Sequence, residues 1–315
     1  MKNEYLKVVD EKKQRRIASI FGTLSQYEDE LGKPIEQFTA REFLNVFVAE
    51  FWTKPQKFRD QRSMICDYLA WLENEKGVQT NRYQFISLTT ESIPNRMFAD
   101  RYFFSLDDIA DALVDLFPNA LHHNQDSREM LCLTLNLFGL THEIINLRES
   151  DIDPESHTVR AQGNVLSDVP ERIMQYIVTL MHQKYYELKN ITRYYENDGY
   201  VLKHAQGLSS DRTVAYIKDR VRLATKLANE RKKKTKWAKK SLRPKDLSMS
   251  YLFCQIYRYE QETGDILGTP TIVERRGKWL TEKFSQWILW DGKIKANRDL
   301  MSEYLLWKNG RDGAE

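Results

Sequence analysis

The chain has 315 residues, of which 41% are hydrophobic and 30% are charged, and its formal net charge is +3. This length allows two domains with buried cores. No run of about 18 apolar residues predicts a membrane span, and the first residues lack the apolar stretch of a signal peptide. The three cysteines have no zinc-site spacing and are typical of small core residues in a reducing cytosol.

The positive charge is concentrated in one stretch. Between Arg220 and Lys245 the sequence has twelve Lys or Arg residues and one acid, Glu230. This stretch therefore carries +11, which leaves −8 for the rest of a chain whose net charge is +3. A dense cationic element on a mildly acidic body indicates a polyanionic partner, most simply nucleic acid. The alternative is a solvated or disordered loop.

The first ninety residues (1–90) predict a small helical bundle. Gly32 ends the first helix, and Thr39 and Glu42 have the spacing of a capping box before the second. Apolar and aromatic residues recur at helical spacing through these elements. The four helices are expected over residues 17–31, 43–52, 56–77 and 81–88.

A linker is expected over residues 91–103, because this segment is polar, contains Pro94 and has no clean period. The second domain is expected over residues 104–315. Ser105 is placed to cap its first helix. The stretch "SREMLCLTLNLFGL", residues 127–140, is nearly all apolar and predicts a helix at the centre of this domain's core.

A hairpin is predicted after the acidic loop that ends at Asp153. The segments "TVRAQ" and "VLSDVP" predict two short strands around a turn at Gly163–Asn164. Residues 171–188 return to helical spacing. Later helix boundaries are expected at Ser210–Asp211, Pro244 and Gly264. The expected fold is therefore mainly α, with one small antiparallel sheet in the second domain.

Two stretches carry a resemblance to a known family. "FGLTHEIINLRESDID", residues 138–153, is similar to the segment of the tyrosine recombinases that carries their first catalytic arginine directly after Gly-Leu. "TVRAQGNVLSDVP", residues 158–170, is similar to their lysine-bearing hairpin. The first domain resembles the family's helical, SAM-like core-binding module, which clamps DNA from the other side. The resemblance implies a two-domain clamp around double-stranded DNA.

The resemblance also implies which positions would carry the family's chemistry. In that family a tyrosine attacks a DNA phosphate, and arginines and a lysine stabilise the charge on the transferring phosphoryl group. Histidines transfer protons, and no metal or cofactor is needed. The aligned positions lack the required residue types, so the scaffold is expected not to be an enzyme. These positions are Thr141, Gln162, Lys245, Ser248, Thr269 and Phe284.

DNA attachment needs only cations that meet phosphates. In the first domain, the expected contacts flank helix starts: Arg41, Lys54, Lys57, Arg59 and Arg62. In the second domain, they lie in the basic stretch: Arg231, Lys232, Lys233, Lys234, Lys236, Lys239, Lys240, Arg243 and Lys245. A second cationic knot comprises Arg275, Arg276 and Lys278.

The combination of a core-binding-like domain with substituted catalytic positions resembles the lytic-cycle master repressors of SPbeta-type prophages. The resemblance implies a sequence-specific repressor that binds operator sites in the bacterial cytosol and associates with the nucleoid. A regulatory protein or a peptide-linked antirepressor is a further candidate partner, and no membrane is expected. This step from fold to role is an analogy.

Two alternatives stay open. The first is a divergent, active recombinase in which Tyr304 is the nucleophile and Arg148 or Arg160 supplies charge. The second is an accessory protein that acts mainly through protein contacts. A covalent protein–DNA adduct would distinguish the first, and failure to bind any duplex at low salt would favour the second.

Overall fold

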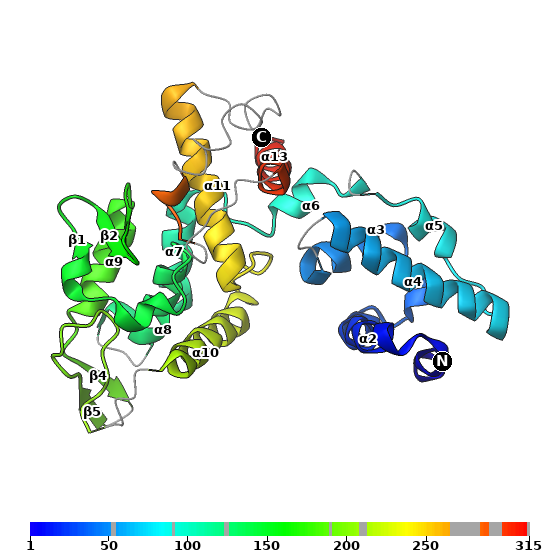
Figure 1. The fold of residues 1–315 in the computed structure, drawn as a ribbon, viewed down its shortest axis with the longest axis horizontal. Helices are drawn as coiled ribbons and strands as arrows, with labels where there is room; N and C mark the ends of the chain where they lie inside the picture. Colours follow the sequence, from blue (N-terminus) through cyan, green and yellow to red (C-terminus); the bar gives the residue numbers. More distant parts are fainter. Residues whose placement is uncertain are drawn as a thin grey trace. The chain divides into compact units, whose positions relative to one another are not determined.

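The computed structural model divides the chain into two compact units, Met1–Phe98 (unit 1) and Ala99–Glu315 (unit 2) (Figure 1). The structure describes residues 1–51, 55–89, 92–122, 126–188, 191–207, 213–264, 284–289 and 298–313. The division falls inside the segment expected to be a linker, and residues 99–103 belong to unit 2. None of the helices in these ranges is long and apolar enough to span a membrane.

Unit 1 is a helical bundle, as predicted. Its long helices α2 (Glu11–Leu31) and α4 (Pro55–Lys76) end at Gly32 and Gly77, whose φ angles of +65° and +62° suit glycine. The predicted second helix is α3 followed by a π-helical turn. Neither α1 nor α6 was predicted, and α6 lies within the expected linker. The shorter elements are α1 (Lys2–Val8), a 3-10 turn (Ile35–Gln37), α3 (Ala40–Val46), the π-helical turn (Phe47–Phe51), α5 (Arg82–Ile86) and α6 (Asn95–Ala99).

Aromatic side chains fill the core of unit 1. Phe21 of α2 meets Tyr68 of α4 edge to face, with ring centroids 4.8 Å apart. Phe43 of α3 stacks on Phe85 of α5, with centroids 4.2 Å apart. Aromatic pairs contribute roughly 0.5–1.5 kcal/mol beyond the burial of their area. The periodic apolar positions of the sequence therefore form one interior that joins helices far apart along the chain.

The predicted capping box at the start of α3 is confirmed. The Thr39 hydroxyl accepts from the Glu42 N–H at 3.3 Å, and the Glu42 carboxylate accepts from the Thr39 N–H at 2.8 Å. Lys33 Nζ lies 2.8 Å from the same carboxylate. Lys33 first, and then Thr39, lower the pKa of Glu42 from its ordinary 4.5 to about 2.

Replacing Glu42→Gln is expected to remove part of the acid sensitivity of unit 1. Because the folded pKa lies below the unfolded one, ionised Glu42 stabilises the fold above pH 4.5, and this contribution is lost as the pH falls through about 2. Urea unfolding at a series of acidic pH values measures the difference. Parallel stability curves for the wild type and the variant would contradict the expectation.

Unit 2 is built around α8 (Ser127–Asn136), whose residues are all buried except Arg128. Helices α7, α9, α10 and α11 contact α8 (Figure 1), which confirms the predicted central helix. Ser105 caps α7, and Gly264 ends α11 at φ +73°, as expected. The remaining helices are α7 (Leu106–Leu116), α9 (Glu171–Met181), α10 (Val214–Lys232), α11 (Pro244–Thr263) and α13 (Arg298–Asp312), with 3-10 turns at Ala120–His122, Glu143–Asn146 and Glu149–Asp151.

The predicted hairpin is present, with its turn one residue earlier. Strands β1 (Ile152–Asp153), β2 (Thr158–Ala161) and β3 (Asn164–Leu166) form an antiparallel sheet in that order. Ala161 pairs with Asn164, so the turn is Gln162–Gly163 rather than Gly163–Asn164. Both turn residues have positive φ, +50° and +73°, which is the requirement of a two-residue hairpin turn.

A second hairpin replaces part of a predicted helix. Residues 171–188 were expected to be helical, but α9 ends at Met181, and β4 (Tyr185–Leu188) pairs with β5 (Ile191–Tyr194). The rings of the paired Tyr185 and Tyr194 lie 5.9 Å apart. Such cross-strand aromatic pairs favour a sheet, and here they prevail over the local helical spacing.

The start of α10 also differs from the expected one. Its cap is Thr213, whose hydroxyl accepts from the Tyr216 N–H at 3.1 Å. The expected caps, Ser210 and Asp211, lie outside the described residues. The Thr hydroxyl satisfies a free N–H of the first turn, which is the role that was expected of Ser or Asp.

Candidate DNA-binding surface

The basic stretch does not form a loose loop between α10 and α11. Residues 233–243, here called the strap, make successive backbone turns and bury Trp237 and Leu242. The indole Nε1 of Trp237 donates to Asp115 of α7 at 2.8 Å. The Ser241 N–H donates to the carbonyl of Arg101 at 2.8 Å. The strap is therefore anchored on unit 2 at both its middle and its end.

Three of the predicted DNA contacts are engaged within unit 2. Lys240 is only 9% exposed, and its Nζ donates to the carbonyl of Tyr102 at 2.6 Å. Lys232 donates through its amine to the carbonyl of Lys240. Arg231 pairs with Asp126 at 2.6 Å. These side chains hold the strap and the end of α10 in place.

The other predicted DNA contacts of this stretch face solvent. Lys239 is 79% exposed and has a weak pair with Asp100 at 3.5 Å. The Nζ of Lys236 lies 4.4 Å from the Trp237 ring centroid. Exposed pairs of this kind contribute little, so a phosphate can replace them. The exposed set is Lys233, Lys234, Lys236, Lys239, Arg243 and Lys245.

The side chains of two of these lysines are available to bind an external anion. Over the described ranges, Lys233 and Lys234 form neither an ion pair nor a hydrogen bond through their side chains, and both are exposed. They follow α10 directly on the anchored strap. The strap therefore presents positive charge on an ordered backbone, which lowers the entropic cost of binding.

The start of α11 has two cations exposed to solvent and one buried ion pair. Arg243 and Lys245 are exposed at its first turn, next to Pro244. Asp246, the following residue, is buried and accepts from Arg101 at 2.6 Å. The two exposed cations thus extend the positive surface of the strap, while the only acid of this turn is directed inward.

The remaining predicted contacts belong to unit 1, apart from the second cationic knot, which belongs to unit 2. Arg41 and Arg59 are exposed. Arg62 is not free, because its guanidinium donates to the carbonyls of Ile86, at 3.3 Å, and Leu88. Lys54, the side chain of Lys57, and the second cationic knot (Arg275, Arg276 and Lys278) lie outside the described part of the chain.

The sequence reasoning missed a group of cations on α2. The first two turns expose Lys12, Lys13, Arg15 and Arg16, while the last turns contain Glu28, Asp29 and Glu30. The N-cap Asp10 and Glu11 precede these cations and supply the acids that the helix dipole favours at its start. The four exposed cations add to the positive surface of unit 1. The segregated "EKKQRR" of the sequence was the available signal.

Three of the positions that the resemblance assigns to catalysis, Thr141, Gln162 and Ser248, lie near the end of α8. Glu143 accepts from both the Thr141 N–H, at 2.9 Å, and the Gln162 side chain, at 3.1 Å. Ser248 is buried and donates to the carbonyl of Asn136 at 2.6 Å. This arrangement places a carboxylate, rather than a cation, between Thr141 and Gln162.

The last assigned positions are apolar or not described. Phe284 is fully buried and stacks on Trp287, with ring centroids 6.0 Å apart. The Leu289 N–H donates to the carbonyl of Phe138 at 2.6 Å, so this segment packs beside the turn that leads to Thr141. Thr269 lies outside the described residues.

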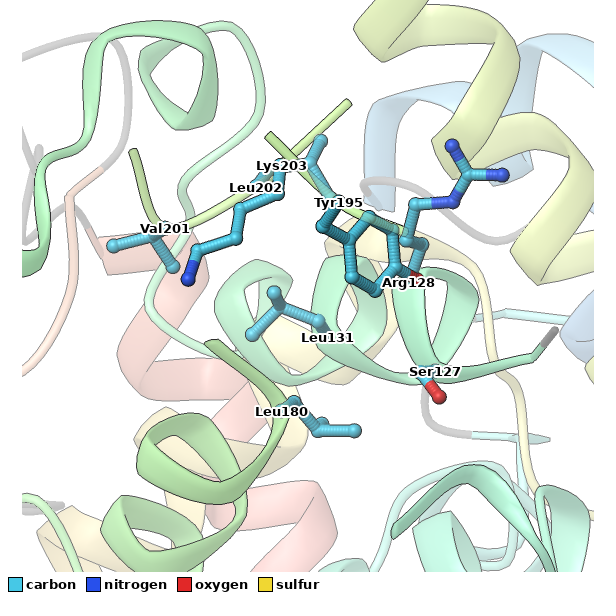
Figure 2. A pocket seen from close by; sticks show the side chains of 8 residues that line it. All are labelled: Ser127, Arg128, Leu131, Leu180, Tyr195, Val201, Leu202 and Lys203. Carbon is cyan, nitrogen blue, oxygen red and sulfur yellow. The ribbon is translucent and has the colours of Figure 1, made fainter. Parts of the chain in front are cut away.

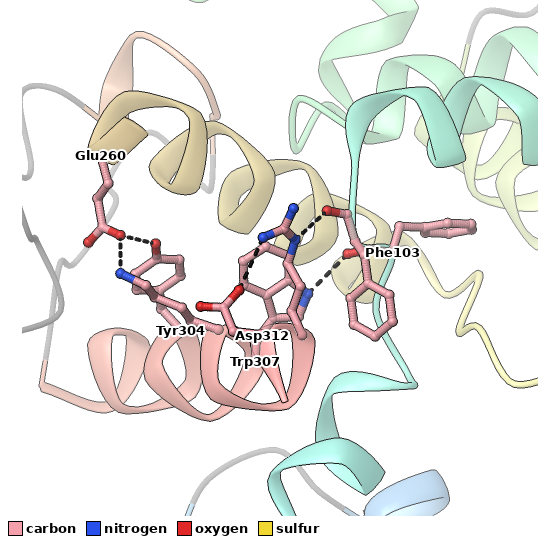
Figure 3. Close-up of polar contacts among 8 residues, drawn as sticks. Phe103, Glu260, Tyr304, Trp307 and Asp312 are labelled. Atoms are coloured by element: carbon pink, nitrogen blue, oxygen red, sulfur yellow. Dashed lines mark hydrogen bonds and ion pairs between the residues drawn. The ribbon is translucent and has the colours of Figure 1, made fainter. Parts of the chain in front are cut away.

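Tyr304, the nucleophile of the alternative interpretation, lies in the core of unit 2 (Figure 3). Its hydroxyl donates to Glu260 of α11 at 2.7 Å, and Lys308 donates to the same oxygen at 2.6 Å. Burial, followed by the bond to Glu260, raises the pKa of Tyr304 far above its ordinary value. This phenol is therefore both covered and difficult to ionise.

The arginines of that alternative are also engaged elsewhere. Arg148 stacks on Tyr200, 3.5 Å from the ring centroid, and donates to its hydroxyl at 2.6 Å. Arg160 is half exposed and lies 3.6 Å from Asp153. Over the described ranges neither arginine contacts Tyr304, and each has a partner of its own in the sheet region of unit 2.

A narrow pocket between α8, α9 and residues 195–203 does not form a polar site (Figure 2). Its two cations diverge: Arg128 is directed toward α10, where it donates to Tyr216 at 3.4 Å, and Lys203 pairs with Glu149 at 2.7 Å. The rest of its lining is largely apolar. Over the described ranges, no group of His, Cys, Asp or Glu side chains could hold a metal ion.

The structure thus defines a mainly helical protein of two units, each with exposed cations. Unit 1 is a helical module of the core-binding type: residues 1–75 match the family model for the MrpR N-terminal core-binding domain. The match lies wholly in unit 1 and spans 75 of 315 residues. A comparison with curated proteins gave no match.

Proposed function

We propose that this protein is a sequence-specific, double-stranded DNA-binding repressor on a tyrosine-recombinase scaffold that no longer cleaves DNA. Its role would be to maintain a prophage in lysogeny by occupying operator sites. The supporting observation is the combination of a core-binding-type domain in unit 1 with the anchored, solvent-facing cations of the strap in unit 2. Both elements meet the requirement of duplex binding, which is positive charge placed for phosphates.

The proposed loss of cleavage is supported by the side chains at the assigned positions. Thr141 and Gln162 flank the Glu143 carboxylate, Ser248 is bonded to a backbone carbonyl, and Phe284 has no hydroxyl. A transferring phosphoryl group needs cations and a nucleophile at these places. A carboxylate there would repel it.

The divergent recombinase remains the alternative function, with Tyr304 as nucleophile. Its burial and its bond to Glu260 weigh against this role, because a nucleophile must reach the phosphate and lose its proton. The accessory-protein alternative requires no duplex binding. A gel-shift or fluorescence-anisotropy titration at low salt distinguishes it directly, and genome-wide mapping of bound sites in the native host tests the operator proposal.

We expect no covalent adduct when the full chain is incubated with a nicked suicide duplex. Thr141→Arg alone should not restore cleavage, because four or more other roles remain unfilled. Denaturing electrophoresis of labelled DNA measures the adduct. An adduct that forms with the wild type and disappears in Tyr304→Phe would replace the proposed function by the recombinase alternative.

A further inference from the structure

Four consecutive carbonyls near the start of unit 2 are each bound by a side chain or backbone of a distant element. Residues 101–104 are here called the lead segment. The carbonyl of Arg101 accepts from the Ser241 N–H at 2.8 Å, and that of Tyr102 accepts from Lys240 Nζ at 2.6 Å. Both donors belong to the strap, so the strap holds the first half of the lead segment.

The C-terminal helix holds the second half (Figure 3). Trp307 Nε1 donates to the carbonyl of Phe103 at 3.0 Å, and Arg311 Nε donates to that of Phe104 at 3.2 Å. Both donors belong to α13, and Trp307 is fully buried. Two elements that do not follow each other in sequence therefore bind the same four residues.

The ring of Phe104 lies close to side chains of both the strap and α13. Lys240 Nζ lies 3.8 Å from its centroid, and the Trp307 ring centroid lies 6.4 Å away. Lys240 therefore contacts both the backbone and a side chain of the lead segment. A buried charge needs hydrogen-bond partners within the protein, so this cation orders its surroundings rather than contacting an external phosphate.

We propose that Lys240 is a positioning residue that couples the strap to α13 through the lead segment. This inference rests on the proposed DNA binding. A duplex bound to Lys233 and Lys234 stabilises the ordered strap, and the ordered strap in turn stabilises the docked α13. Coupling between two sites is reciprocal, so docking of α13 also strengthens duplex binding.

Hydrogen exchange of the full chain, with and without a random-sequence duplex at low salt, tests the coupling. In the wild type, the duplex should slow exchange in α13 and the lead segment by at least about fivefold, the lower end of ordinary coupling. In Lys240→Met, which keeps the length and the apolar burial, the duplex should still bind with an unchanged salt slope, but the protection of α13 should be lost.

Lys239→Met is the matched control, because it removes the same charge from the neighbouring, exposed position. It should lower the salt slope by about one and keep the protection of α13. The proposal would be overturned if the Lys240→Met protein kept the duplex-induced protection of α13. It would also be overturned if this protein had a lower salt slope, as the Lys239→Met protein is expected to have. A wild type that binds the duplex without protection of α13 would also overturn it, whereas a wild type that binds no duplex refutes the proposed function itself.

The Trp307→Phe variant tests the coupling in the opposite direction, from the docking of α13 to duplex binding. This test does not depend on the folding of the Lys240 variant. It removes the indole N–H that binds the carbonyl of Phe103 but keeps an aromatic ring in the core. By reciprocity, it should weaken duplex binding by up to the same factor, about fivefold or more where α13 is fully undocked, at an unchanged salt slope. Unchanged affinity in a folded Trp307→Phe protein would refute the coupling.

Discussion

The variant with Lys233→Ala and Lys234→Ala is expected to bind duplex DNA about 60-fold more weakly at 0.1 M salt. Both lysines are exposed at the start of the anchored strap, and neither has an intramolecular ion pair over the described ranges. Each lost phosphate contact should lower the slope of log K against log salt by about 0.9. The loss should be similar for all sequences, since phosphates carry no base information.

The matched control is Arg222→Ala with Lys226→Ala on α10. These two cations are also exposed, but they pair with Asp219 at 3.1 Å and Glu230 at 3.9 Å. The control removes the same net charge from the preceding helix, so it reports the general electrostatic effect alone. Fluorescence anisotropy over a salt series measures both slopes. Equal slopes for the two double variants would show that the strap is not a specific contact surface.

Asp246→Ala is expected to destabilise unit 2 by about 3–5 kcal/mol, the usual effect of removing one partner of a buried ion pair. Arg101 and Asp246 have side chains that are each 7% exposed, and their charged atoms lie 2.6 Å apart. The Ser241 hydroxyl donates to the same carboxylate oxygen at 2.6 Å. The substitution therefore removes the carboxylate of a buried ion pair and also loosens the end of the strap.

Asp60→Ala in unit 1 provides the comparison. Asp60 pairs with Arg16 at 3.4 Å, and both side chains are substantially exposed, 36% and 45%. The Asp60→Ala substitution should lower the free energy of unfolding by less than about 1 kcal/mol. Combining Asp246→Leu with Arg101→Met should recover most of the stability, because the buried charge is then absent. Urea unfolding of each variant gives the free energies. A cost for Asp246→Ala as small as that for Asp60→Ala would contradict the burial of this pair.

The sequence by itself determined the local structure of both units. The end of α2 at Gly32, the capping box of Thr39 and Glu42, and the start of α11 at Pro244 are all as predicted. These signals act within one helical turn, where the chemistry of a few neighbouring residues decides the backbone conformation. The mainly α fold class and the buried central helix followed from the same local periodicity.

The local signals failed where a contact between distant residues was stronger. The spacing of residues 171–188 predicted a helix, but the pairing of Tyr185 with Tyr194 created β4 and β5. The turn of the first hairpin shifted by one residue for a similar reason, because the pairing of Ala161 with Asn164 fixes which residues remain for the turn. Strand register is a property of two segments together.

The sequence also determined the total charge of the basic stretch, but only the tertiary structure decided which cations are available to a partner. Lys240 is buried, and its Nζ donates a hydrogen bond to the carbonyl of Tyr102, 138 positions earlier, while Lys233 and Lys234 remain exposed. In the same way, Tyr304 was a plausible nucleophile until its bond to Glu260, 44 positions away, placed it in the core. Composition counts charges and hydroxyls, whereas their chemistry depends on long-range neighbours that desolvate or pair them.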